Sequence, residues 1–148
     1  SGPILDSPTF QEREAAFRTI AGTLFREDGI FVESTSFGHV SCASVMRKMR
    51  SWGVQAVIFG YSQDAIQAIS LMGSRGFVIG KDISLISFDD LEMFTLTTPR
   101  ISVISQQVQK IGSLGAKLLL DRVEKRGRAE SQRVKTLYIP RESVAAAL

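Results

Sequence analysis

The chain has 148 residues, of which 44% are hydrophobic and 22% are charged, and its formal net charge is +3. These values are typical of a soluble globular domain, or of one lobe of a larger protein. The basic residues are scattered along the sequence, which disfavours a DNA-binding face within this chain. No apolar run approaches the roughly 20 residues that span a bilayer, and the lone Cys42 excludes an intrachain disulfide.

Apolar spacing predicts alternating helices and strands along the whole chain. Ser7 and Pro8 form a helix start signal, because a hydroxyl can cap the first turn and proline fits its first position. In chain order, the expected elements are a helix from Pro8 to Gly29, a strand over 30–32, a helix over 41–52, a strand over 56–59, a helix over 62–75, strands over 83–88 and 101–105, a helix over 108–126 and a strand over 134–139. Helices of this length between strands indicate βαβ units, and therefore an α/β fold whose parallel sheet is flanked by helices.

The same periodicity predicts which side chains each helix turns toward the core. They are Phe10, Phe17, Ile20 and Leu24 in the first helix, Val45, Met49 and Trp52 in the second, Ala65, Ile69 and Met72 in the third, and Ile111, Leu114 and Leu118 in the last. The strand over 83–88 is an almost continuous apolar run, which is typical of a strand that is buried on both faces.

Two adjacent carboxylates, Asp89 and Asp90, come directly after that buried strand. In an open α/β sheet, ligands bind just beyond the carboxyl ends of the strands, so this pair is a candidate ligand clamp. The segments that follow the other predicted strands are 34–37, 60–62 and 106–107. These segments are rich in hydroxyl and amide groups and include the rings of Phe37 and Tyr61, a mixture that suits a sugar or another polyol.

Arg13 lies on the otherwise apolar stripe of the first helix, at the helical spacing between Phe10 and Phe17. An unpaired buried charge is very costly, so this arginine must be paired or must face a polar cavity. Two interpretations stay open at this point. The arginine binds a ligand in a cavity, or it extends from the edge of the stripe into solvent and pairs with Glu12 or with a more distant acid.

Three separated segments resemble the LacI/GalR (lactose-repressor) family of bacterial transcription regulators. They are SGPILDSPT at 1–9, KDISLISFDD at 81–90 and TPRISVISQ at 98–106. Glu12, Arg13 and Phe17 follow the first segment as they do in the family, and the ending YIPRES at 138–143 is similar to the family's C-terminus. The resemblance covers essentially the whole chain and implies a periplasmic-binding-protein-like (type I) lobe.

The resemblance implies that residues 1–148 are the C-terminal part of an effector-binding domain, without the helix-turn-helix and most of the first lobe. Residues from about 106 to 130 would pack on that absent N-terminal lobe. The implied function is sensing of a sugar-like small molecule together with homodimerisation, and operator DNA would be bound only through the absent N-terminal domain. The implied location is the cytoplasm, and neither a cofactor nor a membrane partner is expected.

The family's effector contacts can be carried onto single positions of this chain. Arg13 matches an arginine that binds effector hydroxyls or carboxylates, and Asp89 matches the acceptor of hydrogen bonds from sugar hydroxyls. Phe37 falls where members of the family place a ring against the ligand. Gln106 matches a residue at the hinge between the lobes.

Ser7 and Thr9 lie where some members of the family contact the ligand, whereas Asp90 is expected to cap the following turn. The chain departs from the family at Tyr61, because members usually carry an Asn-Asp pair after that strand. A tyrosine can stack on a ligand or donate one hydrogen bond, but it cannot replace an amide. Tyr61 is therefore a candidate ligand contact, and an effector other than a simple hexose fits this change.

An enzyme is disfavoured, because the adjacent Asp89 and Asp90 do not flank one bond well and His39 has no second metal ligand at a useful spacing. Ser62 and Ser87 lack a nucleophile-elbow motif, so no catalytic residue is expected. Two alternatives stay open: a periplasmic sugar-binding component of a transporter, and a structural dimerisation lobe without a pocket. The upstream sequence separates a regulator from the first alternative, and ligand titration separates it from the second.

Overall fold

A computed structural model of the chain describes residues 2–36, 42–124 and 131–145. Its four-stranded sheet has the order β1-β2-β3-β4. The strands are β1 (Ala56–Phe59), β2 (Ser84–Phe88), β3 (Ser102–Ser105) and β4 (Leu137–Ile139). The first three are parallel, whereas β4 pairs antiparallel with β3. The predicted α/β fold is confirmed, but the sheet is mixed and the predicted parallel direction is wrong for the last strand.

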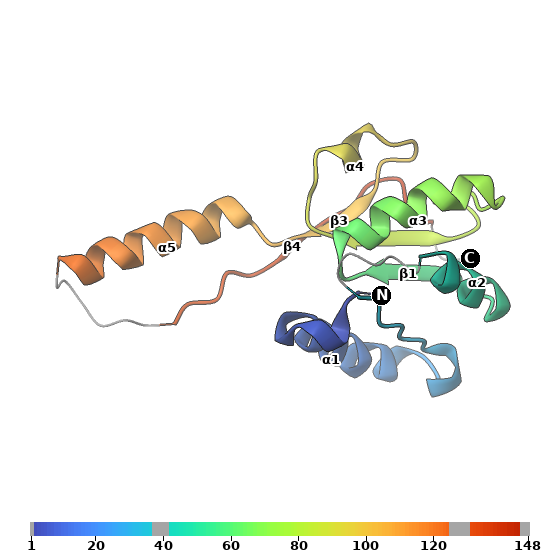
Figure 1. The fold of residues 1–148 in the computed structure, drawn as a ribbon, viewed down its shortest axis with the longest axis horizontal. Coiled ribbons are helices and arrows are strands. Elements are labelled where there is room, and N and C mark those ends of the chain that lie inside the picture. Colours follow the sequence, from blue (N-terminus) through green and yellow to red (C-terminus); the bar gives the residue numbers. More distant parts are fainter. Residues whose placement is uncertain (1, 37–41, 125–130, 146–148) are drawn as a thin grey trace.

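The direction of β4 follows from the path of the chain beyond β3 (Figure 1). Helix α5 (Val108–Val123) starts just after β3 and extends away from the sheet, and the chain returns to the same end of β3 that it left. Leu137 accordingly stands opposite Ser105, the last residue of β3. A strand that re-enters the sheet at that end runs antiparallel to its neighbour, and spacing along the sequence does not reveal this.

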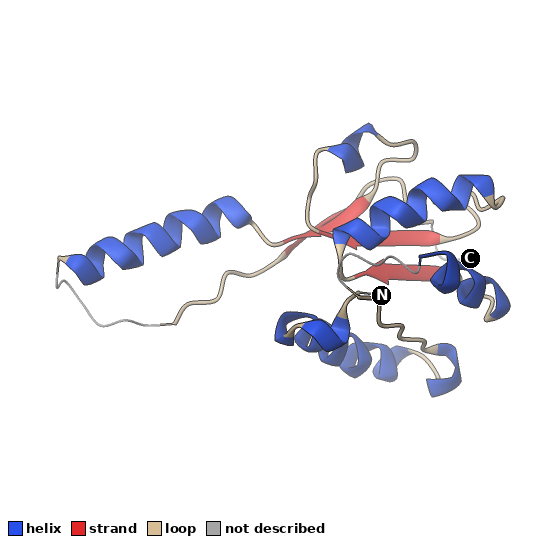
Figure 2. Cartoon of the chain, viewed as in Figure 1, coloured by secondary structure: helices blue, strands red, loops and turns tan. Residues whose placement is uncertain are grey.

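Helices lie around the parallel part of the sheet (Figure 2). They are α1 (Pro8–Leu24), α2 (Cys42–Ser51), α3 (Ser62–Ser74) and the single turn α4 (Met93–Leu96). Two 3-10 turns, η1 (Ile4–Asp6) and η2 (Glu27–Gly29), flank α1. Helices α2 and α3 pack against each other, and this pair, together with Phe94 of α4, supplies the helical side of the core.

The core lies between the sheet and the pair of α2 and α3. The strands contribute the fully buried Phe59, Leu85 and Val103. The two helices add Val45, Met46, Met49, Ala65, Ala68 and Met72. Their predicted inward faces are therefore confirmed except at Trp52, which is 40% exposed and stacks on Phe31 with ring centroids 4.5 Å apart.

Two other helices do not bury all the predicted side chains. In α1, Ile20 and Leu24 are 62% and 69% exposed, and the buried residue is the small Ala21. Ala21 follows Phe17 by four residues, so it continues the half-buried face of the helix while Ile20 lies beside that face. In α5, Ile111 is 45% exposed and no residue is buried, because no strand or helix of the described residues packs along this helix.

Several predicted elements differ from the structure in their bounds or do not form. The first helix ends at Leu24, and the predicted strand over 30–32 does not form. Ser34 makes an isolated bridge, parallel to Gly2, and Ser36 is also assigned a bridge, but residues 30–32 make none. The last strand is limited to 137–139, and the predicted end of the last helix lies partly outside the described residues.

No helix among residues 2–36, 42–124 and 131–145 combines the length and the apolar character that a membrane span needs. In the part of the chain that the structure describes, no group of three or more His, Cys, Asp or Glu side chains could hold a metal ion. His39 lies outside that part.

The segment after β4 folds back onto the start of β2 and β3. The Ser143 hydroxyl donates to the carbonyl of Leu85 at 2.6 Å and accepts a hydrogen bond from the amide of Ser102 at 2.8 Å. Gly80 has a left-handed φ of 79°, and a β-carbon there would lie 2.5 Å from the carbonyl oxygen of Glu142. Only glycine fits such a close approach, so this turn lets the C-terminal segment lie against the sheet.

Candidate functional site

The carboxyl ends of β1, β2 and β3 bring three short segments to one edge of the sheet (Figure 1). Gly60, Tyr61 and Ser62 follow β1 and lead into α3. Asp89 follows β2, and Gln106 follows β3. Parallel strands end at the same edge, so residues that are far apart in the sequence become neighbours there.

Arg13 reaches this edge from α1, and several groups hold its guanidinium. Nη1 donates a hydrogen bond to the carbonyl oxygen of Gly60. Cζ lies 4.1 Å from the ring centroid of Phe88 and 4.8 Å from that of Phe10. Burial lowers the pKa of Arg13, and the charge of Asp89 opposes that shift. Aromatic faces and a nearby carboxylate together compensate a half-buried cation for part of its lost hydration.

The surroundings of Arg13 bear on the two interpretations of its position in the apolar stripe. Pairing with Glu12 is wrong, since the carboxylate of Glu12 lies 3.5 Å from Arg133 instead. The more distant acid is present, because Asp89 acts on the arginine through its charge. Arg13 therefore faces a polar edge of the sheet rather than open solvent.

Asp89 lies at the centre of the hydrogen bonds at this edge. Its Oδ1 accepts a hydrogen bond from Nε2 of Gln106, and its Oδ2 accepts one from the Ser62 hydroxyl at 3.4 Å. Its backbone has a left-handed φ of 67°, and its amide donates to the carbonyl of Ile104 at 3.1 Å. This turn directs the carboxylate across the ends of the neighbouring strands.

Tyr61 adds an aromatic ring beside the charged groups. Its ring is edge-on to that of Phe10, with centroids 5.8 Å apart and an interplanar angle of 83°. Because Phe10 also lies against Arg13, the two rings and the guanidinium form one contiguous group. A few polar groups among aromatic rings are a common lining of small-ligand sites.

The structure brings together some of the predicted site residues. We call the following four the sheet-edge cluster: Arg13, Tyr61, Asp89 and Gln106. Ser7 and Thr9 lie at the start of α1, and neither hydroxyl makes a hydrogen bond to another described residue. Phe37 lies outside the described residues.

The expectation that Asp90 caps the turn after β2 is wrong. Its Oδ1 accepts a hydrogen bond from Nη2 of Arg141 at 2.6 Å. The two residues are 51 positions apart in the sequence, so no local pattern indicates this ion pair.

Sequence reasoning missed several groups at this edge. Phe10 and Phe88 were expected only in the core, and the carbonyl of Gly60 has no side chain to signal its role. A signal for the rings exists, since Phe10 precedes Arg13 by three residues on one helix face and Phe88 directly precedes Asp89.

A second polar pair, Thr35 and Asp64, connects the segment before Phe37 to α3. Asp64, in the first turn of α3, accepts a hydrogen bond from the Thr35 hydroxyl at 2.7 Å. Both side chains are buried. Burial raises the pKa of Asp64, and the hydrogen bond from Thr35 opposes that shift. Asp64 lies on the helix that begins next to Tyr61, so its hydrogen bond from Thr35 links the segment before Phe37 to the sheet edge.

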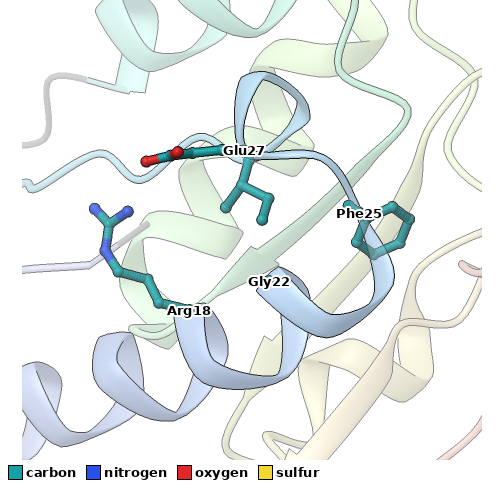
Figure 3. Close-up of a pocket in the computed structure, with 5 residues that line it drawn as sticks. Arg18, Gly22, Phe25 and Glu27 are labelled. Atoms are coloured by element: carbon teal, nitrogen blue, oxygen red, sulfur yellow. The ribbon is translucent and has the colours of Figure 1, made fainter.

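An open depression lies between the second half of α1 and η2 (Figure 3). It is lined by Arg18, Gly22, Phe25, Glu27 and Ile30. None of the sheet-edge cluster lines it, and Arg18 is already paired with Glu14 on its own helix at 2.7 Å. Its polar groups do not converge on one point, so we assign no ligand site to this depression.

Residues 5–144 match the model of a family described as "periplasmic binding protein-like domain". A curated relative is named "probable HTH-type transcriptional repressor ExuR" and comes from Bacillus subtilis (strain 168). The chain is 36% identical to it over 90 residues, which cover 60% of this chain and 27% of that protein. The chain thus spans only part of the curated relative's length.

Solved structures match over nearly the whole chain. A LacI family transcriptional regulator from Bifidobacterium animalis subsp. lactis has a TM-score of 0.84 and 25% identity, and the match covers 99% of this chain and 54% of that one. A periplasmic binding ribose operon repressor protein from Lactobacillus acidophilus has a TM-score of 0.82 and 27% identity, with 93% and 51% covered. These matches confirm the predicted fold and the predicted resemblance, and the proteins are named as regulators or repressors rather than as enzymes.

Proposed function

The chain belongs to the family of periplasmic-binding-protein-like domains, and from this premise we propose that it is the effector-sensing part of a LacI/GalR-type transcription regulator. Its effector is a sugar-like small molecule, and binding changes the DNA affinity of the intact protein. The sheet-edge cluster carries the proposal, because it lies at the carboxyl ends of three parallel strands, where open α/β sheets bind ligands.

The chemistry of the cluster suits a polyol. Arg13 supplies N–H donors, Asp89 supplies acceptor oxygens and Tyr61 supplies a ring. The cluster carries one cation, Arg13, and one anion, Asp89, so its formal charges sum to zero and a neutral ligand fits this edge. Sugar hydroxyls donate and accept hydrogen bonds, which matches this mixture of groups.

The remaining ligand contacts in the proposal come from the family resemblance. Ser7 and Thr9 would contact the ligand from the start of α1, and Phe37 would place a ring against it. Gln106 holds Asp89 and lies between β3 and α5, where the chain leaves the sheet. A group at that position can link the ligand edge to the movement of a second lobe.

The proposed mechanism is an equilibrium between two lobe arrangements, of which the effector stabilises one. Residues from about 106 to 130 would pack on a first lobe, and the uncovered apolar side chains of α5 support this placement. Homodimerisation, operator binding through a separate N-terminal domain and a cytoplasmic location belong to the same proposal.

A periplasmic sugar-binding component of a transporter is the second candidate, since the matched family is described as a periplasmic binding protein-like domain. The curated relative is named as a repressor, which favours the regulator. The reading frame upstream of Ser1 separates the two candidates. A helix-turn-helix followed by another βαβ lobe supports the regulator, and a signal peptide or lipoprotein leader supports the transport receptor.

Ligand titration of the intact protein tests the site. The probes are D-ribose, D-glucose and D-glucuronate, followed by calorimetry. We expect Arg13→Ala and Asp89→Ala each to weaken binding by about tenfold or more, because hydrogen bonds to charged groups contribute roughly 1.5–3 kcal/mol.

The matched control for this titration is Arg18→Ala, on the same helix as Arg13. Arg18 is exposed and pairs with Glu14, so its loss should leave affinity unchanged. Unchanged affinity in both cluster variants would show that the site is assigned wrongly. A protein that binds none of the sugars would favour a structural dimerisation lobe.

A further inference from the structure

We propose that Arg141 is a positioning residue for Asp89 and that it acts through Asp90. The inference rests on the proposed function, in which Asp89 accepts hydrogen bonds from the effector. Arg141 itself is not among the residues that face the ligand edge: it follows β4 and belongs to the segment that folds back onto the sheet.

Hydrogen bonds to the start of β3 hold Arg141 in one orientation. Its Nη1 donates to the carbonyl of Ile101 at 2.8 Å. Its backbone amide donates to the Ser102 hydroxyl at 2.8 Å, and that hydroxyl donates to the carbonyl of Arg141 at 3.2 Å. The side chain of Arg141 is only 12% exposed. The rigid, planar guanidinium therefore presents Nη2 as a donor at a fixed place.

That donor binds the residue next to Asp89. Nη2 of Arg141 lies 2.6 Å from Oδ1 of Asp90, whose side chain is 31% exposed. Water screens a partly buried ion pair less than a fully exposed one, so this contact is stronger than an ordinary surface pair. Asp90 consequently has a defined position although it lies outside the strand.

Asp89 depends on such an external constraint because of its backbone. Its φ of 67° is left-handed, a region that aspartate visits more readily than most residues with a β-carbon but still populates sparsely. On one side of the Asp89–Asp90 peptide, Arg141 holds the carboxylate of Asp90. On the other side, Gln106 holds the carboxylate of Asp89, and the amide of Asp89 donates to the carbonyl of Ile104. Releasing either side allows the turn to relax toward an ordinary backbone conformation and moves the carboxylate away from its partners.

A positioning role and a merely structural role differ in a measurable way. If Arg141 only stabilises the fold, its removal lowers the melting temperature but leaves the hydrogen bond between Gln106 and Asp89 intact in the folded protein. If Arg141 positions Asp89, that hydrogen bond is lost while the protein is still folded.

The side-chain amide of Gln106 reports this hydrogen bond by NMR in the intact protein labelled with 15N-glutamine. Its signals are assigned by their disappearance in Gln106→Asn. We expect Arg141→Ala and Asp90→Ala to move the bonded amide proton to the position that it has in Asp89→Ala. The double variant, Arg141→Ala with Asp90→Ala, should give no further shift, because both changes remove the same hydrogen bond between Arg141 and Asp90.

Arg100→Ala is the matched control. Arg100 pairs with Glu142, the residue after Arg141, but both of these side chains are largely exposed. This variant should leave the Gln106 amide where it is in the wild type. The proposal is overturned if that amide keeps its wild-type position in folded Arg141→Ala. Where that variant does not fold, the same outcome in Asp90→Ala overturns it.

A third variant covers the case in which neither alanine variant folds. Arg141→Lys keeps the charge but cannot bind Asp90 and the carbonyl of Ile101 in the same geometry. We expect an intermediate shift of the Gln106 amide in this variant, and an unchanged amide would contradict the proposal.

Titration with D-ribose separates a failure of this inference from a failure of the proposed function. If the wild-type protein binds ribose, Arg141→Ala should weaken binding by about tenfold, as expected for a displaced charged acceptor. Unchanged ribose affinity in that variant would count against the inference alone. If the wild-type protein does not bind the sugars, that result counts against the proposed function, and the Gln106 amide still tests the role of Arg141.

Discussion

α3 and α5 have similar amphipathic sequences but different environments in the fold. α3 buries Ala65, Ala68 and Met72 completely, whereas α5 buries none of its residues. Each helix closely follows a strand, but α3 packs against α2 while α5 extends away from the sheet (Figure 1). Periodicity in the sequence thus specifies which face of a helix is apolar, and the path of the chain decides what covers that face.

The largest expected effect on stability concerns the packed helix, α3. Met72→Ala leaves a cavity in the core, because Met72 is fully buried on α3, and should lower the free energy of unfolding by about 2–5 kcal/mol. Chemical denaturation of the intact protein measures this change. Gln67→Ala on the same helix is the control, since Gln67 is exposed and its loss should change stability by less than about 0.5 kcal/mol.

The second prediction tests whether a first lobe covers α5. In the intact protein, Leu118→Ala should cost about 2 kcal/mol or more if the predicted stripe is packed there. In the 148-residue chain alone, the same change should cost less than about 0.5 kcal/mol, because no described element packs on α5. Small effects in both proteins would mean that the first lobe does not cover this helix.

The exposed apolar surface of α5 also predicts association of the isolated chain. Its exposed large apolar residues are Val108, Ile111, Leu119, Leu120 and Val123. Such surfaces are usually covered, so sedimentation of the 148-residue chain should show a mass that increases with concentration. Replacing Leu119 and Leu120 with glutamate should reduce the association. A monomer at all concentrations, with α5 in solvent, would contradict this prediction.

The smallest effect concerns the buried pair at the start of α3. Burial raises the pKa of Asp64, so the folded protein retains this proton to a higher pH than the unfolded chain does. The stability that the protonated group contributes is fully present below the pKa of the unfolded chain and is lost as the pH rises through the folded pKa.

Asp64→Asn keeps an acceptor for the Thr35 hydroxyl but removes the charge. As the pH rises above the ordinary pKa of an aspartate, about 4, the melting temperature of the wild type should therefore fall relative to that of the variant. A difference between the two that does not change with pH would show that Asp64 does not titrate in this way.

Much of the sheet edge could be predicted from the sequence, but the groups that surround Arg13 could not. Alternation of helices and strands places the residues after β2 and β3 at one edge, so the proximity of Asp89 and Gln106 follows from the fold class. The stripe of α1 indicates that Arg13 faces inward, but not that Gly60 and Phe88 surround it. Those neighbours depend on how closely α1 approaches β1 and β2, which has no local signal.

By itself, the sequence determined the local features: the apolar faces of α2 and α3, most of the strands and the carboxylate directly after β2. These depend on interactions among residues that are a few positions apart, so periodicity records them. Only the tertiary structure decided the antiparallel direction of β4, the uncovered face of α5 and the pairing of Asp90 with Arg141. Each of these depends on where distant segments meet in space, and that geometry leaves no periodic trace along the chain.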